Sequence, residues 1–201
     1  MTAAGTCTIW LQRHAQPQIA RGICYGATNM PADAKATDAA ARAMLHEWRE
    51  AGLQPGVLWH SPLRRCEQLA ASVHALEPGF TLQRCDALRE MDFGTWEGRR
   101  WDDIARPELK AWTDDFWHYA PGGGEPLSSM MQRIAGALHA AQRQALQAKA
   151  PALWITHAGV IQGLHWLLTR RARQPAAHEW PSVRPGYGEW LRLPLPALSD
   201  R

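Results

Sequence analysis

Short apolar segments that alternate with helical patterns are the feature of this sequence that most limits its fold. Since parallel strands need long crossover connections, which are usually helices, this order predicts an α/β domain with a largely parallel central sheet covered by helices on both faces. The 201 residues suit one such domain of ordinary size, so we expect a single domain over 1–201. The segments with the length and composition of strands are 6–12, 57–60, 80–84, 152–156 and 187–193.

The helical segments are recognised by their ends. Asp33 can cap an alanine-rich helix that continues to about residue 51, where Gly52 follows. Ser61 and Pro62 predict the start of a second helix, with serine as N-cap and proline at the first helical position, that continues to about residue 76. Further helices are expected over 102–119, 131–149 and 159–169.

Composition and charge exclude several classes of protein. The formal net charge of +3 is small and there is no basic run, so we expect no nucleic-acid partner. No apolar run approaches the ~18 residues of a membrane-spanning helix, and residues 1–11 lack the basic start and apolar core of a secretion signal, so no membrane contact is expected and the predicted location is cytoplasmic. The four cysteines form no CxxC pair, which favours reduced thiols over a zinc site or disulfides.

Basic and imidazole side chains follow three of the predicted strands. Arg13 and His14 come after the first strand, Arg65 lies shortly after the second, and His157 follows the fourth. Ligands of open α/β sheets bind beyond the carboxyl ends of the strands, so these side chains are expected to share one site. In a regular strand Arg13 and His14 would face opposite sides, so their joint use requires that both lie just past the strand end. Taken singly each is more often a structural residue, but together they predict an oxyanion site.

Two predicted helix starts support an anion site. Arg64 and Arg65 fall in the first turn after Ser61, where the helix dipole disfavours cations unless an anion is held there. The helix after His157 begins with Ala158 and Gly159, whose small side chains leave their N–H groups open to phosphate oxygens.

Five ordered motifs resemble those of a known superfamily. They are Leu-Gln-Arg-His-Ala at 11–15, Ser-Pro-Leu-Arg-Arg-Cys-Glu-Gln-Leu-Ala at 61–70, Leu-Arg-Glu-Met-Asp-Phe-Gly-Thr-Trp-Glu-Gly at 88–98, Pro-Gly-Gly-Gly-Glu at 121–125 and Thr-His-Ala-Gly at 156–159. In order and content they are similar to the motifs of the histidine phosphatase (phosphoglycerate mutase-like) superfamily. Residues 22–31 and the 61–66 motif most resemble the α-ribazole phosphatases, which dephosphorylate α-ribazole 5′-phosphate in cobalamin synthesis.

The resemblance implies a phosphoglycerate mutase-like fold and a role for each matching residue. His14 would be the nucleophile, Glu90 the proton donor, and Arg13, Arg65 and His157 the phosphate clamp. Three further residues would bind substrate, namely Tyr25, Gly26 and Ala158, the last of which stands where the family commonly has glycine.

These residue types suit phosphoryl transfer. An unprotonated imidazole can attack phosphorus and form phosphohistidine, which divides hydrolysis into two steps. Arginine donors and a protonated or N–H-donating His157 stabilise the charge on the equatorial oxygens. Glu90 must be protonated to donate to the leaving alkoxide, and then acts as base for the attacking water. This chemistry requires no metal or other cofactor, and no acidic or histidine cluster has the spacing of a metal site.

Other matching positions have two interpretations. Glu97 and Glu125 stand beside glycines and are interpreted as structural residues, with substrate contact as the alternative. Four tryptophans are interpreted as core or lid packing and could instead stack on an aromatic base; they are Trp96, Trp101, Trp112 and Trp117. Departures from the family pattern at Asn29, Pro126 and Gln162 affect the rim of the site and its specificity.

The sequence thus predicts a metal-independent phosphomonoesterase that acts through phospho-His14 on a small phosphorylated metabolite. The first candidate substrate is α-ribazole 5′-phosphate. The alternatives are a broad-specificity or sugar-phosphate phosphatase, a phosphoglycerate mutase, and a catalytically silent module that binds a phosphorylated ligand. A mutase is disfavoured because the segment 98–121 is too short for the helical insertion of family mutases. A homodimer is compatible with the sequence.

Overall fold

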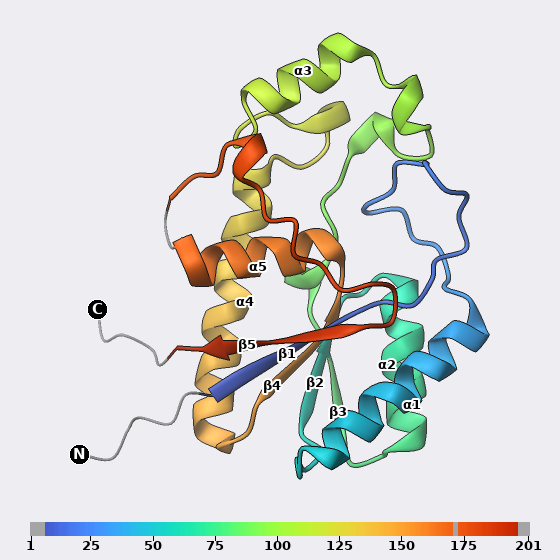
Figure 1. Cartoon of the computed structure of the whole chain (residues 1–201), viewed down its shortest axis with the longest axis vertical. Helices are drawn as coiled ribbons and strands as arrows, with labels where there is room; N and C mark the ends of the chain where they lie inside the picture. Colours follow the sequence, from blue (N-terminus) through green and yellow to red (C-terminus); the bar gives the residue numbers. More distant parts are fainter. Residues whose placement is uncertain (1–6, 171–172, 197–201) are drawn as a thin grey trace.

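The computed structural model describes residues 7–170 and 173–196, which form an α/β fold around one five-stranded sheet (Figure 1). The strands are β1 (Cys7–Arg13), β2 (Val57–His60), β3 (Thr81–Arg84), β4 (Ala152–Thr156) and β5 (Trp190–Leu195). Their order is β3-β2-β4-β1-β5; neighbouring strands are parallel except β5, which runs antiparallel to β1. The predicted α/β class and largely parallel sheet are confirmed.

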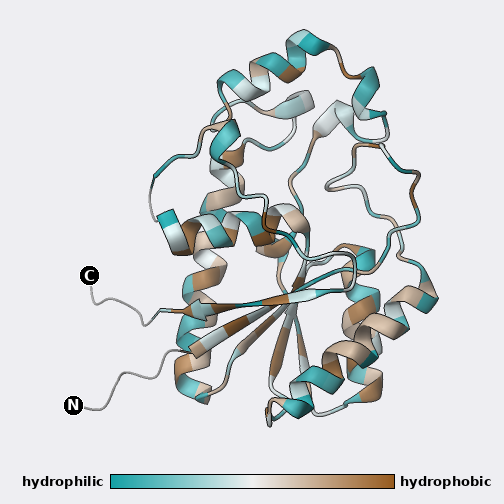
Figure 2. Ribbon diagram, viewed as in Figure 1, coloured by the Kyte–Doolittle hydropathy of each residue, from teal (hydrophilic) through white to brown (hydrophobic). Residues whose placement is uncertain are grey.

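Helices cover both faces of the sheet, as predicted. The helices are α1 (Ala34–Glu50), α2 (Arg64–Leu76), α3 (Arg106–Asp114), α4 (Leu127–Ala148) and α5 (Ala158–Arg170). In β1, Ile9 and Leu11 pack into a core with α4 and α5, whereas Trp10 packs into a second core with α1 and α2. This is the side-chain alternation expected of a strand that is buried on both faces. Figure 2 shows hydrophobic residues recurring along the strands and interspersed with hydrophilic residues along the helices.

The starts of α1 and α2 differ in how well the sequence predicted them. Asp33 caps α1 and accepts a hydrogen bond from the N–H of Ala36 at 2.8 Å, as expected. The prediction that Ser61 is the N-cap of the next helix is wrong, because α2 begins at Arg64. The N–H of Arg64 donates instead to Oδ1 of Asn29 at 2.7 Å, and the Ser61 hydroxyl lies 2.8 Å from Nε2 of His157.

Two other predicted elements are shorter than expected. Only Arg106–Asp114 of the predicted helix over 102–119 is α-helical, and Figure 1 places this helix, α3, away from the sheet. The segment that contains α3 packs around buried Trp96, so contacts between aromatic rings, rather than a longer helix, determine its conformation. The last strand begins at Trp190, later than predicted, because Tyr187 and Gly188, whose φ is 77°, form a turn. Residue 6 of the predicted first strand lies outside the described residues.

Candidate active site

The ladder between β1 and β4 brings two imidazoles together. Arg13 pairs with Thr156 in the parallel register, and the N–H of His14 donates to the Thr156 carbonyl at 3.0 Å. The rings of His14 and His157 therefore lie 5.1 Å apart between centroids, inclined by 57°. The expectation that Arg13 lies past the strand is wrong, since it is the last residue of β1; only His14 lies beyond the strand end.

The environment of His14 leaves one ring nitrogen free for attack. Nδ1 lies 2.8 Å from the carbonyl oxygen of Ala15, which can only accept, so Nδ1 carries the hydrogen and Nε2 keeps its lone pair. The side chain is 2% exposed. Burial, followed by the charge of Arg65, lowers the pKa of His14 well below its ordinary value. A neutral imidazole with an unprotonated Nε2 is the form that can attack phosphorus.

His157 is a buried ring whose surroundings disfavour the cation. Its ring is fully buried, and burial together with the Arg65 charge lowers its pKa well below the ordinary value. Nε2 lies 2.8 Å from Oγ of Ser61 and 3.5 Å from Sγ of Cys66. Of the two predicted forms of His157, these surroundings favour the N–H-donating one.

Arg65 is held by two backbone carbonyls. Its Nη1 donates to Thr28 at 2.8 Å and its Nη2 to Gly26 at 2.6 Å. A Cβ at Gly26 would lie 1.8 Å from the carbonyl oxygen of Met91, so only glycine permits this close approach. In the described part of the chain, Nε of Arg65 and Nε of Arg13 are buried without a hydrogen-bond partner. Arg13 therefore keeps a donor that an oxyanion could use, whereas Arg65 contributes its charge.

A cavity of about 580 Å³ opens beside these residues. The predicted site residues that line it are Arg13, His14, Tyr25, Glu90 and Ala158. Arg65, His157 and Gly26 do not line it; they are buried, and the first two act on His14 through charge and ring contact. The described residues contain no cluster of three or more side chains suited to holding a metal ion.

Tyr187 is a site residue that the sequence reasoning missed. The Arg13 guanidinium lies over its ring, 3.9 Å from the centroid, and its hydroxyl is 2.8 Å from the hydroxyl of Tyr25. The Tyr187 ring is also 5.6 Å from that of His14. The available signal was its place between Gly186 and Gly188, which is typical of a turn rather than of the strand assigned to it.

The Glu90 carboxylate is held at the first turn of α5. Its Oε2 accepts a hydrogen bond from the N–H of Gly159 at 2.9 Å, and its Oε1 accepts one from the N–H of Met91 at 3.1 Å. The expectation that the Gly159 N–H is open to phosphate is therefore wrong, because Glu90 occupies it. The carboxylate nevertheless lies in the cavity wall together with His14.

Aromatic rings form a continuous wall of the cavity. Phe93 contacts Trp101 and Trp112 at centroid distances of 5.4 and 5.9 Å. Phe116 continues the series, 5.6 Å from Trp112 and 5.7 Å from Trp180. All five rings line the cavity, so Trp101 and Trp112 are placed to touch a ligand, whereas Trp96 is buried and Trp117 packs, partly buried, against the core.

Glu97 and Glu125, for which substrate contact is the alternative interpretation, both bind other groups of the protein. Glu97 accepts hydrogen bonds from the N–H groups of Ala27, Thr28 and Phe93, and Glu125 forms a two-point ion pair with Arg133. Neither lines the cavity, which agrees with their interpretation as structural residues. Among the described helices none has the length and apolarity needed to cross a membrane.

Comparisons with known proteins agree with this geometry. The sequence profile of the histidine phosphatase superfamily (branch 1) matches residues 9–184. The adenosylcobalamin/α-ribazole phosphatase of Escherichia coli (strain K12) is 28% identical over an alignment of 193 residues, and the match covers 93% of this chain and 89% of that protein. The solved structure of the α-ribazole phosphatase from Shigella flexneri has a TM-score of 0.73 and 25% identity, covering 96% of each chain. A mycobacterial glucosyl-3-phosphoglycerate phosphatase has a TM-score of 0.73 and 23% identity, covering 94% of this chain and 90% of its own, and shares the fold.

Proposed function

We propose, since this chain belongs to the histidine phosphatase superfamily (branch 1), that it hydrolyses a small phosphomonoester through a phosphohistidine formed on His14. The chain is a phosphatase, and what is proposed is its mechanism and its substrate. The observation that carries the mechanism is the state of His14: Nδ1 is tied to the Ala15 carbonyl at 2.8 Å, and the neutral ring keeps Nε2 free in the cavity wall.

In the first step, Nε2 of His14 attacks phosphorus and the bond to the leaving oxygen breaks. Negative charge spreads over the equatorial oxygens, where the unused donor of Arg13 and the charge of Arg65 stabilise it. Protonated Glu90 gives its proton to the leaving oxygen, a contribution on the order of 10²–10⁴-fold for general acids.

In the second step, Glu90 is a carboxylate and accepts a proton from water. That water attacks phosphorus, the bond to Nε2 breaks, and phosphate leaves with Glu90 protonated again. The N–H of Gly159 supports the carboxylate in this half of the cycle, since it donates to Oε2 at 2.9 Å at the positive end of a helix. Neither step needs a metal ion.

For the substrate, we propose α-ribazole 5′-phosphate. Its phosphoryl group would meet His14 and Arg13, and its benzimidazole would lie along Trp101 and Trp112. The cavity of about 580 Å³ has the size of sites that enclose small organic ligands. The relative from Escherichia coli, named for activity on α-ribazole phosphate, supports this choice.

The mechanism is tested with p-nitrophenyl phosphate in the presence of EDTA. Wild type should hydrolyse it, and brief reaction with labelled substrate should leave an alkali-stable phosphoprotein. His14→Ala should abolish both signals because it removes the attacking nitrogen. His46→Ala is the matched control, since that histidine is exposed on α1 and should keep both signals. Loss of activity with the chelator, or turnover by His14→Ala, would contradict the mechanism.

The substrate is tested with a panel of α-ribazole 5′-phosphate, ribose 5-phosphate, 3-phosphoglycerate and glucosyl-3-phosphoglycerate. We expect the highest kcat/KM for α-ribazole 5′-phosphate, and a selective loss on it in Trp112→Ala because the stacking ring is gone. A stacked ring is worth ~1 kcal/mol, or about fivefold. Equal kcat/KM across the panel would identify a broad-specificity phosphatase, and binding without turnover would identify a silent module.

A further inference from the structure

An ion pair outside the cavity holds the segment that carries Glu90. We propose that Arg133 and Glu125 are positioning residues that set the place of the Glu90 carboxylate in the reaction. The inference rests on the proposed role of Glu90 as proton donor. It gives a reaction role to a pair that does not touch the cavity.

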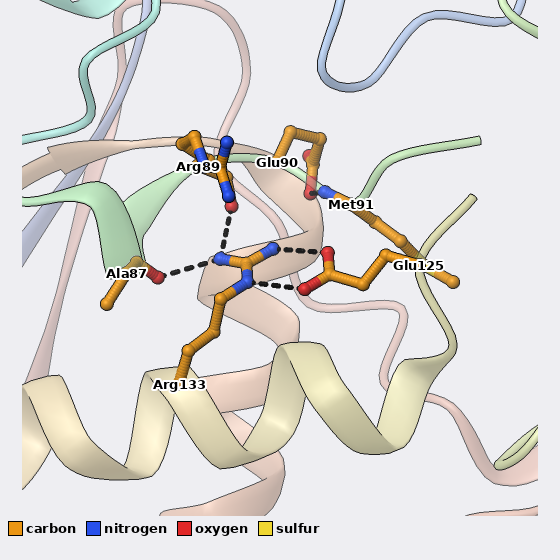
Figure 3. Close-up of polar contacts among 6 residues, drawn as sticks. All are labelled: Ala87, Arg89, Glu90, Met91, Glu125 and Arg133. Atoms are coloured by element: carbon orange, nitrogen blue, oxygen red, sulfur yellow. Dashed lines mark hydrogen bonds and ion pairs between the residues drawn. The ribbon is translucent and has the colours of Figure 1, made fainter. Parts of the chain in front are cut away.

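Arg133, on α4, uses its planar guanidinium on two sides (Figure 3). Nε and Nη2 donate to the two carboxylate oxygens of Glu125, both at 2.7 Å. Nη1 donates to the carbonyl oxygens of Ala87 at 2.7 Å and Arg89 at 2.6 Å. The side chains of Arg133 and Glu125 are only 15% and 19% exposed, so water competes little for these bonds.

These bonds fix the backbone on both sides of Glu90. Arg89, whose carbonyl accepts from Arg133, directly precedes Glu90 in the chain. On the other side, the backbone N–H of Glu125 donates to the carbonyl of Asp92 at 2.8 Å. Glu125 thus holds one end of the segment through its backbone and the other end through Arg133. Residues 89–92 belong to none of the strands β1–β5, so these bonds from Arg133 and Glu125 hold their backbone in place of strand pairing.

The carboxylate of Glu90 has little room to move beside the first turn of α5. Oε2 of Glu90 meets the N–H of Gly159 at 2.9 Å, and a Cβ at Gly159 would lie 2.4 Å from Oε1. A proton donor must lie within hydrogen-bond reach of the leaving oxygen, and a misplacement of about 1 Å can cost on the order of 10²-fold in rate. A shift of the backbone at residues 89–92 would therefore reach the reaction through Glu90.

A positioning role and a merely structural role differ in one measurable respect. Loss of proton donation slows a substrate in proportion to the basicity of its leaving group, whereas loss of folded protein slows all substrates equally. Phenyl phosphate and p-nitrophenyl phosphate have similar shapes, but phenolate is the more basic leaving group. Their kcat/KM values report transfer to His14, so the ratio of the two measures how well Glu90 is placed.

The experiment compares this ratio in wild type, Glu90→Gln, Arg133→Met and Glu125→Gln. Glu90→Gln should lower kcat/KM for phenyl phosphate the most. Arg133→Met should lower it about 10- to 100-fold, with less than about threefold on p-nitrophenyl phosphate. Glu125→Gln keeps one acceptor and should change the ratio in the same direction by less. Arg49→Met is the matched control, because it breaks an exposed ion pair with Glu77 on the surface and should leave the ratio unchanged.

The outcomes separate this inference from the proposed function. If Glu90→Gln changes the ratio and the Arg133 and Glu125 variants do not, the positioning role is refuted while the proposed mechanism is kept. If Glu90→Gln leaves the ratio unchanged, the proton-donor role itself fails. Should Arg133→Met fail to fold, Glu125→Gln decides, and Gly159→Ala, whose Cβ displaces the same carboxylate directly, shows how the ratio changes when Glu90 is misplaced. A ratio that changes in Gly159→Ala and not in Glu125→Gln would refute the inference, and so would a ratio that changes in neither.

Discussion

Acid should destabilise this protein through two buried imidazoles. Burial and the charge of Arg65 lower the pKa of His14 and of His157 well below their ordinary value of 6.5. Well above pH 6.5 both rings are neutral in the folded and the unfolded chain, and they contribute no pH dependence. Below it the unfolded chain takes up protons that the folded protein does not, so the free energy of unfolding falls as the pH falls.

The size of this effect follows from linkage. Each ring that stays neutral in the folded state destabilises it by about 1.4 kcal/mol per pH unit below 6.5. While both rings stay neutral, their slopes add, so that the free energy of unfolding falls by about 3 kcal/mol per pH unit. That is a large part of the roughly 5–15 kcal/mol by which ordinary domains are stable. Replacing one ring by a side chain that does not titrate should remove half of it.

The assay is urea unfolding, followed by tryptophan fluorescence, of wild type and His14→Gln between pH 5 and pH 7.5. Phosphate and sulfate are left out of the buffers, because a bound anion would favour the protonated rings. We expect the stability of His14→Gln to fall less steeply, by about 1.4 kcal/mol per pH unit, in the acidic range. His46→Gln, on the exposed side of α1, is the control and should follow wild type. Parallel curves for wild type and His14→Gln would refute the reasoning.

Two substitutions test the contacts around the arginines. Tyr187→Leu removes the ring under Arg13 and should weaken inhibition by inorganic phosphate about two- to fivefold, the equivalent of ~0.5–1 kcal/mol. Tyr187→Phe keeps the ring and should change this inhibition less than about twofold. Equal effects of the two substitutions would exclude the ring contact as the cause. Gly26→Ala should lower the free energy of unfolding by about 1–3 kcal/mol and reduce hydrolysis of p-nitrophenyl phosphate, because its Cβ would push residue 26, whose carbonyl accepts from Arg65, away from the Met91 carbonyl. An unchanged urea midpoint would contradict this.

The part of the site that the sequence predicted depends on the ends of strands. Strand signals at 152–156 and near 6–12 were strong, and parallel neighbours end at the same edge of a sheet, so His14 and His157 could be expected close together. The structure places their rings 5.1 Å apart. The start of α1 was predictable for a similar reason, since the Asp33 cap is a contact between residues close in sequence.

The rest depends on contacts between residues far apart in the chain. Ser61 has the pattern of an N-cap, but its hydroxyl faces His157, which is 96 residues away, and Asn29 takes over at the start of α2. The predicted helix over 102–119 is too long because the aromatic rings around Trp112 pack on one another rather than along one face of a helix. Tyr187 was missed for the same reason, as its partners Arg13 and Tyr25 lie more than 160 positions earlier in the chain.

The parallel pairing of β1 with β4 has a consequence for how this enzyme can diversify. The spacing of the two imidazoles is set by backbone bonds in the middle of the sheet, such as that from His14 to Thr156, which no change of a side chain at the rim alters. The aromatic wall, in contrast, is built from connecting segments outside the sheet. Loops tolerate insertion and exchange far better than central strands do. Changes in the aromatic wall can therefore alter the substrate that is bound while the distance between the rings of His14 and His157 stays constant.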